Sequence, residues 1–158
     1  MAKVSLFVLE NKHDLHLSFT TIDTISLLYS YMTQGHLLQI TDADNRVVGV
    51  LAYYQGTPDQ EFKDKEIAFA DMAISDRSYR GTRLFLKGLQ FWVSQVEKEH
   101  PEVQELRLAA LSENTYLCKL YAKFTQESYD RDGGIGKETV FCVKIHTIKT
   151  TLKNFIKV

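Results

Sequence analysis

The stretch from Ser75 to Phe85 reads Ser-Asp-Arg-Ser-Tyr-Arg-Gly-Thr-Arg-Leu-Phe and joins the apolar segment Ile67–Ile74 to a long amphipathic segment. This pattern predicts a buried strand, a polar turn and a helix that begins near Gly81. Glycine lets a ligand approach the backbone, and the first turn of a helix offers unpaired N–H donors and a partial positive charge. Arg80 and Arg83 add two full charges. The stretch therefore predicts an anion site that would suit a pyrophosphate group.

The composition limits the class of protein. With 158 residues, the chain is long enough to bury its own core, and we expect a single domain over residues 1–158. A net charge of −1 gives no reason to expect a nucleic acid or a membrane as the partner. No signal-peptide pattern follows Met1 and no apolar run is long enough to cross a bilayer, so we expect a cytoplasmic protein. Cys118 and Cys142 lack metal-type spacing, which predicts buried free thiols and no metal.

The segments before the central strand predict strands, a helix and a hairpin. Short strands are expected at Val4–Leu9 and Leu15–Phe19. Thr20 and Asp23 match a capping box, followed by a helix that ends near Gly35 and would bury the stripe Ile22, Ile25, Leu28 and Met32. The β-rich runs His36–Thr41 and Arg46–Tyr54 should then pair as an antiparallel hairpin.

The segments after the turn complete the predicted fold. A helix buries Phe85, Leu89, Trp92 and Val96, and a strand at Leu106–Leu111 and a helix at Asn114–Phe124 follow it. Ser128–Arg131 and Glu138–Ile145 predict a closing hairpin, and residues 146–158 a short helix or an ordered tail. The order predicts an α/β (α+β) fold, with a mixed, largely antiparallel central sheet flanked by helices.

Two segments of this predicted fold resemble the signatures of the GNAT superfamily of acyl-CoA N-acyltransferases. Met72–Leu84 is similar to its strand–loop–helix motif, in which Gln/Arg-x-x-Gly-x-Gly/Ala follows the strand. Glu113–Phe124 is similar to its second signature, in which an asparagine opens a helix that carries Leu-Tyr-x-Lys. Ser78 stands where the family prefers glutamine or arginine, and Arg83 where it prefers a small residue. The resemblance covers about Gln34 to Ile145.

The resemblance implies a GNAT fold that uses acetyl-CoA as co-substrate, and it assigns roles to residues of both segments. It implies that the pantetheine arm pairs with backbone groups of Met72, Ala73 and Ile74 and is bonded by Asn114. It also implies that the pyrophosphate is surrounded by Arg80, Gly81, Thr82, Arg83 and Leu84. Tyr121 would lie near the thioester sulfur and protonate the departing CoA thiolate.

The group that deprotonates the acceptor amine is open between two carboxylates, Glu66 and Asp71, and a water molecule. Glu66 shares strand parity with Met72 and can face the cleft, so it is the candidate base, with a solvated strand-end carboxylate as the alternative. Asp71 points to the opposite face of a regular strand. It should find a structural hydrogen bond, because burying a lone carboxylate is costly.

These features predict an N-acetyltransferase that transfers an acetyl group from acetyl-CoA to a primary amine of a small molecule or protein. A non-catalytic acyl-CoA-binding sensor of the same fold is the main alternative. A homodimer subunit that associates through its C-terminal strand and tail is another. Acceptor-binding segments are expected around Ser26–Gln34, Thr57–Lys65 and Ser128–Gly136, whose mixed charge selects no acceptor.

Overall fold

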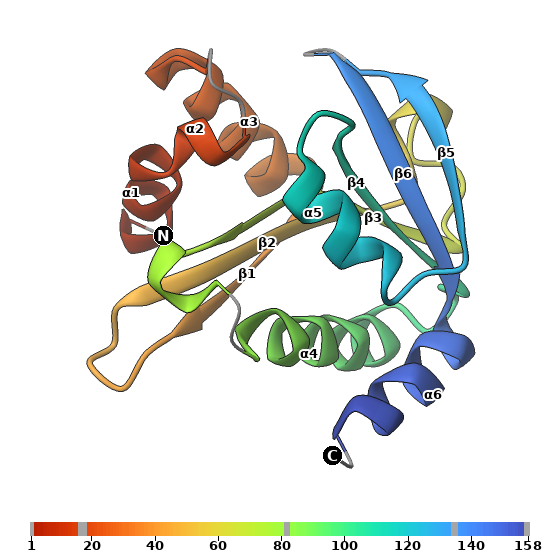
Figure 1. The fold of residues 1–158 in the computed structure, drawn as a ribbon. Coiled ribbons are helices and arrows are strands. Elements are labelled where there is room, and N and C mark those ends of the chain that lie inside the picture. The colour runs from red at the N-terminus through yellow and green to blue at the C-terminus, as the bar shows by residue number, and fades with distance from the viewer. Residues whose placement is uncertain (1, 16–18, 81–82, 134–135, 157–158) are drawn as a thin grey trace. The chain divides into compact units, whose positions relative to one another are not determined.

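The computed structural model describes residues 2–15, 19–80, 83–133 and 136–156 (Figure 1). The chain divides into two compact units, Met1–Tyr54 with Met72–Leu89, and Gln55–Asp71 with Gln90–Val158. Strand β3 (Ile67–Ser75) and helix α4 (Leu84–Glu99) contribute residues to both units. The expectation of one domain over residues 1–158 stays a prediction.

The N-terminal segment is helical, so the predicted strand at Val4–Leu9 is wrong, and the predicted strand at Leu15–Phe19 lies largely outside the described residues. Helix α1 spans Ala2–Glu10 and helix α2 spans Lys12–Leu15. Val4, Phe7 and Val8 are the buried residues of α1, and their spacing places them on one helical face. Helix α1 contacts helix α3, beside which it lies in Figure 1. The contact of one apolar face outweighs the β propensity of the valines.

Helix α3 (Thr21–Gln34) begins at the predicted capping box. The Thr20 hydroxyl accepts a hydrogen bond from the Asp23 N–H at 3.1 Å, and the Thr20 N–H donates to the Asp23 carboxylate at 2.9 Å. The predicted buried stripe is wrong except at Leu28, because the exposed residues include Ile22, Ile25 and Met32.

Thr24 and Tyr31 occupy the buried face of α3 in place of that stripe. The Thr24 hydroxyl donates to the Thr20 carbonyl at 3.0 Å, which satisfies its polar atom inside the unit. The Tyr31 ring stacks on Tyr54 at 4.8 Å between centroids. A polar residue, Thr24, and an aromatic residue, Tyr31, therefore take the buried positions that the sequence pattern predicted for isoleucine and methionine.

The first predicted hairpin is confirmed. Strands β1 (His36–Thr41) and β2 (Val47–Gln55) pair antiparallel from His36↔Tyr53 to Thr41↔Val47. Asp42 closes the connecting turn, because its carboxylate accepts hydrogen bonds from the N–H groups of Asp44 and Arg46, both at 2.9 Å.

The second unit contains strand β4 (Glu105–Leu111), helix α5 (Thr115–Ala122), strands β5 (Glu127–Asp132) and β6 (Lys137–Lys144) and helix α6 (Ile145–Ile156). Strands β5 and β6 form the predicted antiparallel hairpin, and β6 also pairs antiparallel with β4. Helix α5 contacts β4 and β6, as Figure 1 shows, and the C-terminal segment is a helix that buries Ile148 and Leu152.

The predicted fold class is confirmed by the pairing of the strands. The six-stranded sheet has the order β1-β2-β3-β4-β6-β5. Strand β3 pairs parallel with β4 from Ile67↔Glu105 to Ala70↔Leu108, whereas the pairs β1–β2, β4–β6 and β5–β6 are antiparallel. Leu89, Trp92 and Val96 of α4 are buried as predicted, and Phe85 is half-buried. Over the described ranges, no helix combines the length and the apolar character that a membrane crossing needs.

The loop between β2 and β3 contains the short 3₁₀ helix η1 (Pro58–Gln60) and is held at both ends. The Gly56 N–H donates to the Ile67 carbonyl at 2.7 Å, and the Thr57 N–H and hydroxyl both donate to the Asp64 carboxylate at 2.7 Å. Gly56 has a φ of +93°, and a Cβ atom there would lie 2.7 Å from the Phe62 Cα. Only glycine fits this position without strain.

Gly56→Ala should destabilise the protein by about 2–4 kcal/mol, since it combines a positive φ with a clash against backbone atoms. Gly49→Ala is the matched control, because a Cβ atom at Gly49 meets its nearest neighbours at an ordinary 3.7 Å. Urea unfolding of both variants measures the difference. Equal unfolding free energies for the two variants would contradict the strained geometry of this loop.

Candidate functional site

The turn between β3 and α4 is stabilised by Asp76. The Asp76 N–H donates to the Val48 carbonyl of β2 at 2.8 Å. Its carboxylate accepts hydrogen bonds from the Ser78 hydroxyl at 2.7 Å and the Ser78 N–H at 2.9 Å, which starts the 3₁₀ helix η2 (Arg77–Tyr79). These bonds hold the pKa of Asp76 below its usual value. Asp76 therefore caps η2, with Ser78 as its hydrogen-bond partner.

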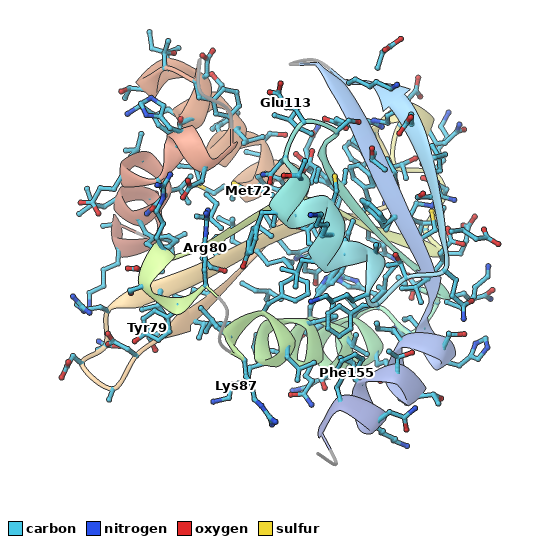
Figure 2. The ribbon with its side chains drawn as sticks, viewed as in Figure 1. Met72, Tyr79, Arg80, Lys87, Glu113 and Phe155 are labelled. Atoms are coloured by element: carbon cyan, nitrogen blue, oxygen red, sulfur yellow. The ribbon has the colours of Figure 1, made fainter. Side chains whose placement is uncertain are left out.

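Two arginines of the turn converge on one carboxylate oxygen. Nη2 of Arg77 donates to Oδ1 of Asp14 at 2.9 Å, and Nη2 of Arg80 lies 3.5 Å from the same oxygen. The Arg80 side chain extends from the end of η2 (Figure 2). Guanidinium groups use the same N–H donors for carboxylate and phosphate oxygens. The Asp14 carboxylate therefore occupies a position that a phosphate group could take at this turn. The donor set fits the diphosphate of a nucleotide cofactor.

The other predicted cofactor residues lie in both units. Met72 and Ile74 are buried on β3, Ala73 is half-buried, and Leu84 is buried at the start of α4. Arg83 is exposed, and Gly81 and Thr82 lie outside the described residues.

Asn114 caps the second predicted signature. Its side-chain oxygen accepts a hydrogen bond from the Leu117 N–H at 3.1 Å and thereby starts helix α5. The amide nitrogen of Asn114 is the group that could donate a hydrogen bond to a ligand.

Tyr121 is buried at the end of α5. Its ring meets Phe141 of β6 edge-on, with 5.9 Å between the centroids. Burial raises the pKa of the Tyr121 hydroxyl, and Cys118, Asp71 and Tyr116 add to the rise. The hydroxyl therefore keeps its proton at neutral pH and is a hydrogen-bond donor.

Asp71 is a carboxyl group of the second unit whose pKa is raised. Burial raises the pKa of Asp71 to about 7, and the charge of Glu138 adds to this rise, whereas its own backbone amide and Arg131 lower the pKa. Among the described residues, Oδ1 of Asp71 is buried with no hydrogen-bond partner, so the structural bond expected from the sequence is not found for this atom. An unsatisfied buried carboxyl oxygen is a feature of binding and catalytic sites.

Arg131 of β5 organises the charges near Asp71. Its Nε donates to the Glu138 carboxylate at 3.0 Å and its Nη1 to the Asp59 carboxylate at 2.6 Å. The guanidinium also lies over the Phe69 ring, 5.4 Å from its centroid. Phe69 and Asp71 are two residues apart on β3 and so share one face of the strand.

Sequence reasoning missed this arginine, because it lies in a hairpin of ordinary composition. The one usable signal was Asp71, since a carboxyl group in an apolar strand requires a charged or polar neighbour. The described contacts supply Glu138 and Arg131 as those neighbours.

Glu66 lies ahead of β3 and its side chain is exposed. Its carbonyl accepts hydrogen bonds from the N–H groups of Gln104 at 2.8 Å and Glu105 at 3.1 Å. Asp71, not Glu66, is among the groups that raise the pKa of Tyr121. The role of Glu66 as the base stays a prediction.

Both cysteines are free, as expected, and Cys142 is buried as predicted, whereas Cys118 is half-buried. The Cys118 thiol faces the Leu111 carbonyl at 3.5 Å, and burial raises the pKa of both thiols. A raised pKa disfavours the thiolate, so neither cysteine has the properties of a nucleophile. In the part of the chain that the structure covers, no cluster of three or more His, Cys, Asp or Glu side chains could hold a metal ion.

The comparisons with known proteins rest on structure. No protein-family model and no curated protein matches the sequence. A GNAT-family acetyltransferase from Staphylococcus aureus Mu50 has a TM-score of 0.68 at 11% identity, with 90% of this chain and 92% of that chain covered. A GNAT-family acetyltransferase from Elizabethkingia anophelis with acetyl-CoA bound has a TM-score of 0.58 at 12% identity, covering 75% and 82%. A mutant of spermidine N-acetyltransferase from Vibrio cholerae has a TM-score of 0.62 at 10% identity, covering 91% of each chain.

The chain therefore has the fold of the GNAT acetyltransferases, and the resemblance found in the sequence is confirmed at this level. Identities of 10 to 12% show the fold, not the reaction or the substrate.

Asp71→Asn should change how stability depends on pH. The folded-state pKa of Asp71, about 7, exceeds its ordinary value of 3.8, so the stability from its protonated form is present at low pH and lost as pH rises through about 7. The variant should match the wild type near about pH 4 and be more stable by roughly 2–4 kcal/mol near about pH 8. Urea unfolding at both pH values measures this difference.

Glu138→Gln and Arg131→Gln form a matched control pair for this assignment. Removing the Glu138 charge should lower the pKa of Asp71, and removing the Arg131 charge should raise it. Carbon-13 NMR of the Asp71 carboxyl follows both pKa values. Shifts in the same direction for the two variants would contradict the charge arrangement described above.

Proposed function

We propose that the protein is an acetyl-CoA-dependent N-acetyltransferase that acts on a primary amine of a small molecule or a protein. The observation that carries this proposal is the convergence of Arg77 and Arg80 on one oxyanion at the β3–α4 turn of a GNAT fold. The presence of acetyl-CoA in the E. anophelis structure supports the choice of cofactor. The name of the V. cholerae enzyme supports an amine as the acceptor class. A cytoplasmic location and a homodimer stay predictions from the sequence.

In this proposal, the cofactor is held mainly by backbone groups and arginines. Backbone groups of Met72, Ala73 and Ile74 bind the pantetheine arm as an added strand would, which tolerates side-chain variation. The Asn114 amide group donates to the same arm. The diphosphate is bound at the turn by Arg80, Gly81, Thr82, Arg83 and Leu84.

Acetyl-CoA, when bound, supplies an acetyl group activated as a thioester. We assign the base to Asp71 rather than Glu66, because Asp71 lies near enough to Tyr121 to raise the pKa of its hydroxyl, whereas Glu66 is exposed ahead of β3. A carboxyl group with a pKa of about 7 also exchanges protons readily at neutral pH. Asp71 removes a proton from the acceptor ammonium, and the neutral amine then attacks the acetyl carbon. A backbone N–H group of β3 stabilises the negative charge on the carbonyl oxygen. Asp71→Asn and Glu66→Gln, compared in their pH–rate profiles, separate the two candidate bases.

Tyr121 acts on the leaving thiolate as the bond to carbon breaks. A free thiol has a pKa near about 8.5, below that of the buried phenol, so complete transfer of the phenolic proton is uphill. The hydroxyl would therefore act first as a hydrogen-bond donor to the developing thiolate and give up its proton as the C–S bond breaks, so that the CoA thiol leaves. The nitrogen's second proton, released as the amide forms, would restore the phenol.

A non-catalytic acyl-CoA sensor is the second candidate, because Ser78 and Arg83 stand where the GNAT pattern has other residues and the base is open between Asp71 and Glu66. The Ser78 side chain bonds Asp76, and the two arginines contact Asp14, so the turn is stabilised without any ligand. Tight CoA binding without turnover of any amine would select the sensor.

Arg80→Ala should weaken CoA binding by about 1–3 kcal/mol, because it removes a charge-assisted contact to the diphosphate. Lys87→Ala is the matched control, since Lys87 is an exposed cation on α4 (Figure 2). Isothermal titration calorimetry with acetyl-CoA and CoA measures both variants. The proposal fails if the wild type binds neither compound at roughly millimolar concentration.

Tyr121→Phe should lower turnover by ~10²–10⁴ when the chemical step is rate-limiting, because the ring still packs on Phe141 while the hydroxyl donor is lost. CoA affinity should stay nearly unchanged. Turnover with a panel of amines and calorimetry with CoA measure the two effects separately. Wild-type turnover in the phenylalanine variant would remove Tyr121 from the mechanism.

A further inference from the structure

The contact between Asp14 and the two turn arginines joins segments that are far apart in the sequence. Asp14 lies on α2, and its N–H donates to the Asn11 carbonyl at 2.9 Å. Its carboxyl side chain is only 10% exposed, whereas the side chains of Arg77 and Arg80 are 73% and 37% exposed. A mostly buried carboxylate is thus held against two cations at the surface of the turn.

The geometry of η2 explains why both arginines reach the same atom. Arg77 starts the 3₁₀ helix and Arg80 caps its end, where the Arg80 N–H donates to the Arg77 carbonyl at 3.2 Å. Side chains three residues apart in a 3₁₀ helix project from the same side. The two guanidinium groups therefore lie close together, and Asp14 offsets their mutual repulsion.

The two contacts differ in strength. Arg77 makes a hydrogen bond of 2.9 Å to Asp14, while the Arg80 nitrogen at 3.5 Å makes a longer ion pair with the same oxygen. The longer distance and the partly exposed guanidinium group make the Arg80 contact the weaker of the two. Arg80 is therefore the group that can exchange Asp14 for another anion, with Arg77 keeping Asp14 in place.

Resting on the function proposed above, we infer that Asp14 is an internal counter-ion that competes with the cofactor diphosphate for Arg80. Cofactor binding moves the Arg80 guanidinium from the carboxylate of Asp14 to a phosphate oxygen, and Arg77 remains on Asp14. Asp14 is then a positioning residue that lowers cofactor affinity while it keeps the two arginines together in the free protein.

The test uses CoA and, separately, inorganic pyrophosphate as probes in isothermal titration calorimetry. Asp14→Asn should bind both probes roughly two- to tenfold more tightly, since it removes the competing charge. Asp44→Asn is the control, because it removes one negative charge from an exposed turn residue, and it should bind like the wild type. In an Arg80→Ala background, Asp14→Asn should no longer increase affinity.

A second measurement needs no variant of Asp14 and remains valid if Asp14→Asn does not fold. Nitrogen-15 NMR of the arginine side chains should show that CoA shifts the Arg80 Nε–H signal strongly and the Arg77 signal weakly. A CoA-bound protein in which the Arg80 signal does not move overturns the inference.

The outcomes separate this inference from the proposed function. Wild-type protein that binds neither CoA nor pyrophosphate overturns the proposed function, and the inference with it. Wild-type protein that binds CoA, together with a folded Asp14→Asn variant of equal or weaker affinity, overturns the inference alone.

Discussion

The burial of the Asp71 carboxyl group on an otherwise apolar strand is the constraint on which the second unit depends. An ionised and unpaired carboxyl group at this buried position would cost several kcal/mol. The pKa of Asp71 is therefore raised to about 7, which favours its protonated form. Arg131 of β5 adds a positive charge near Asp71, and its guanidinium group binds the carboxylates of both Glu138 and Asp59. The hairpin, the η1 loop and the central strand are thus connected through one guanidinium group.

In the first unit, the electrostatic constraint is the repulsion between positive charges at the β3–α4 turn. Three arginines fall within seven residues, from Arg77 to Arg83, and such a density of positive charge opposes a compact turn. Asp76 accepts the bonds that shape the turn, and Asp14 brings a counter-charge from the N-terminal helices. A turn whose conformation depends on anionic partners is suited to bind a further anion. The stability of this turn should therefore depend on ligand binding.

The parts of the structure that depend on local sequence could be predicted, and those that depend on packing between segments could not. The capping box at Thr20 and the Asn114 cap of α5 each need residues within one helical turn, so their sequence pattern was sufficient. The N-terminal helices were missed because valine-rich segments favour strands until a partner surface, here α3, selects the helical face. Asp14 could not be found as a partner of Arg77, since 63 residues separate them.

The low identity to the GNAT acetyltransferases that share this fold is compatible with a proposed site built largely from backbone groups and charge. Strand pairing and helix termini bind a ligand through groups that nearly every residue possesses, so the side chains on them can change while the binding mode persists. In the proposed mechanism, side chains are constrained only where a proton moves or a phosphate is neutralised, which means Asp71, Tyr121 and Arg80. Ser78 and Arg83 depart from the family pattern. In this turn the Ser78 side chain bonds Asp76, and the Arg83 side chain is exposed. Divergence at those two positions is therefore compatible with a site of the same kind that is formed mainly by backbone groups.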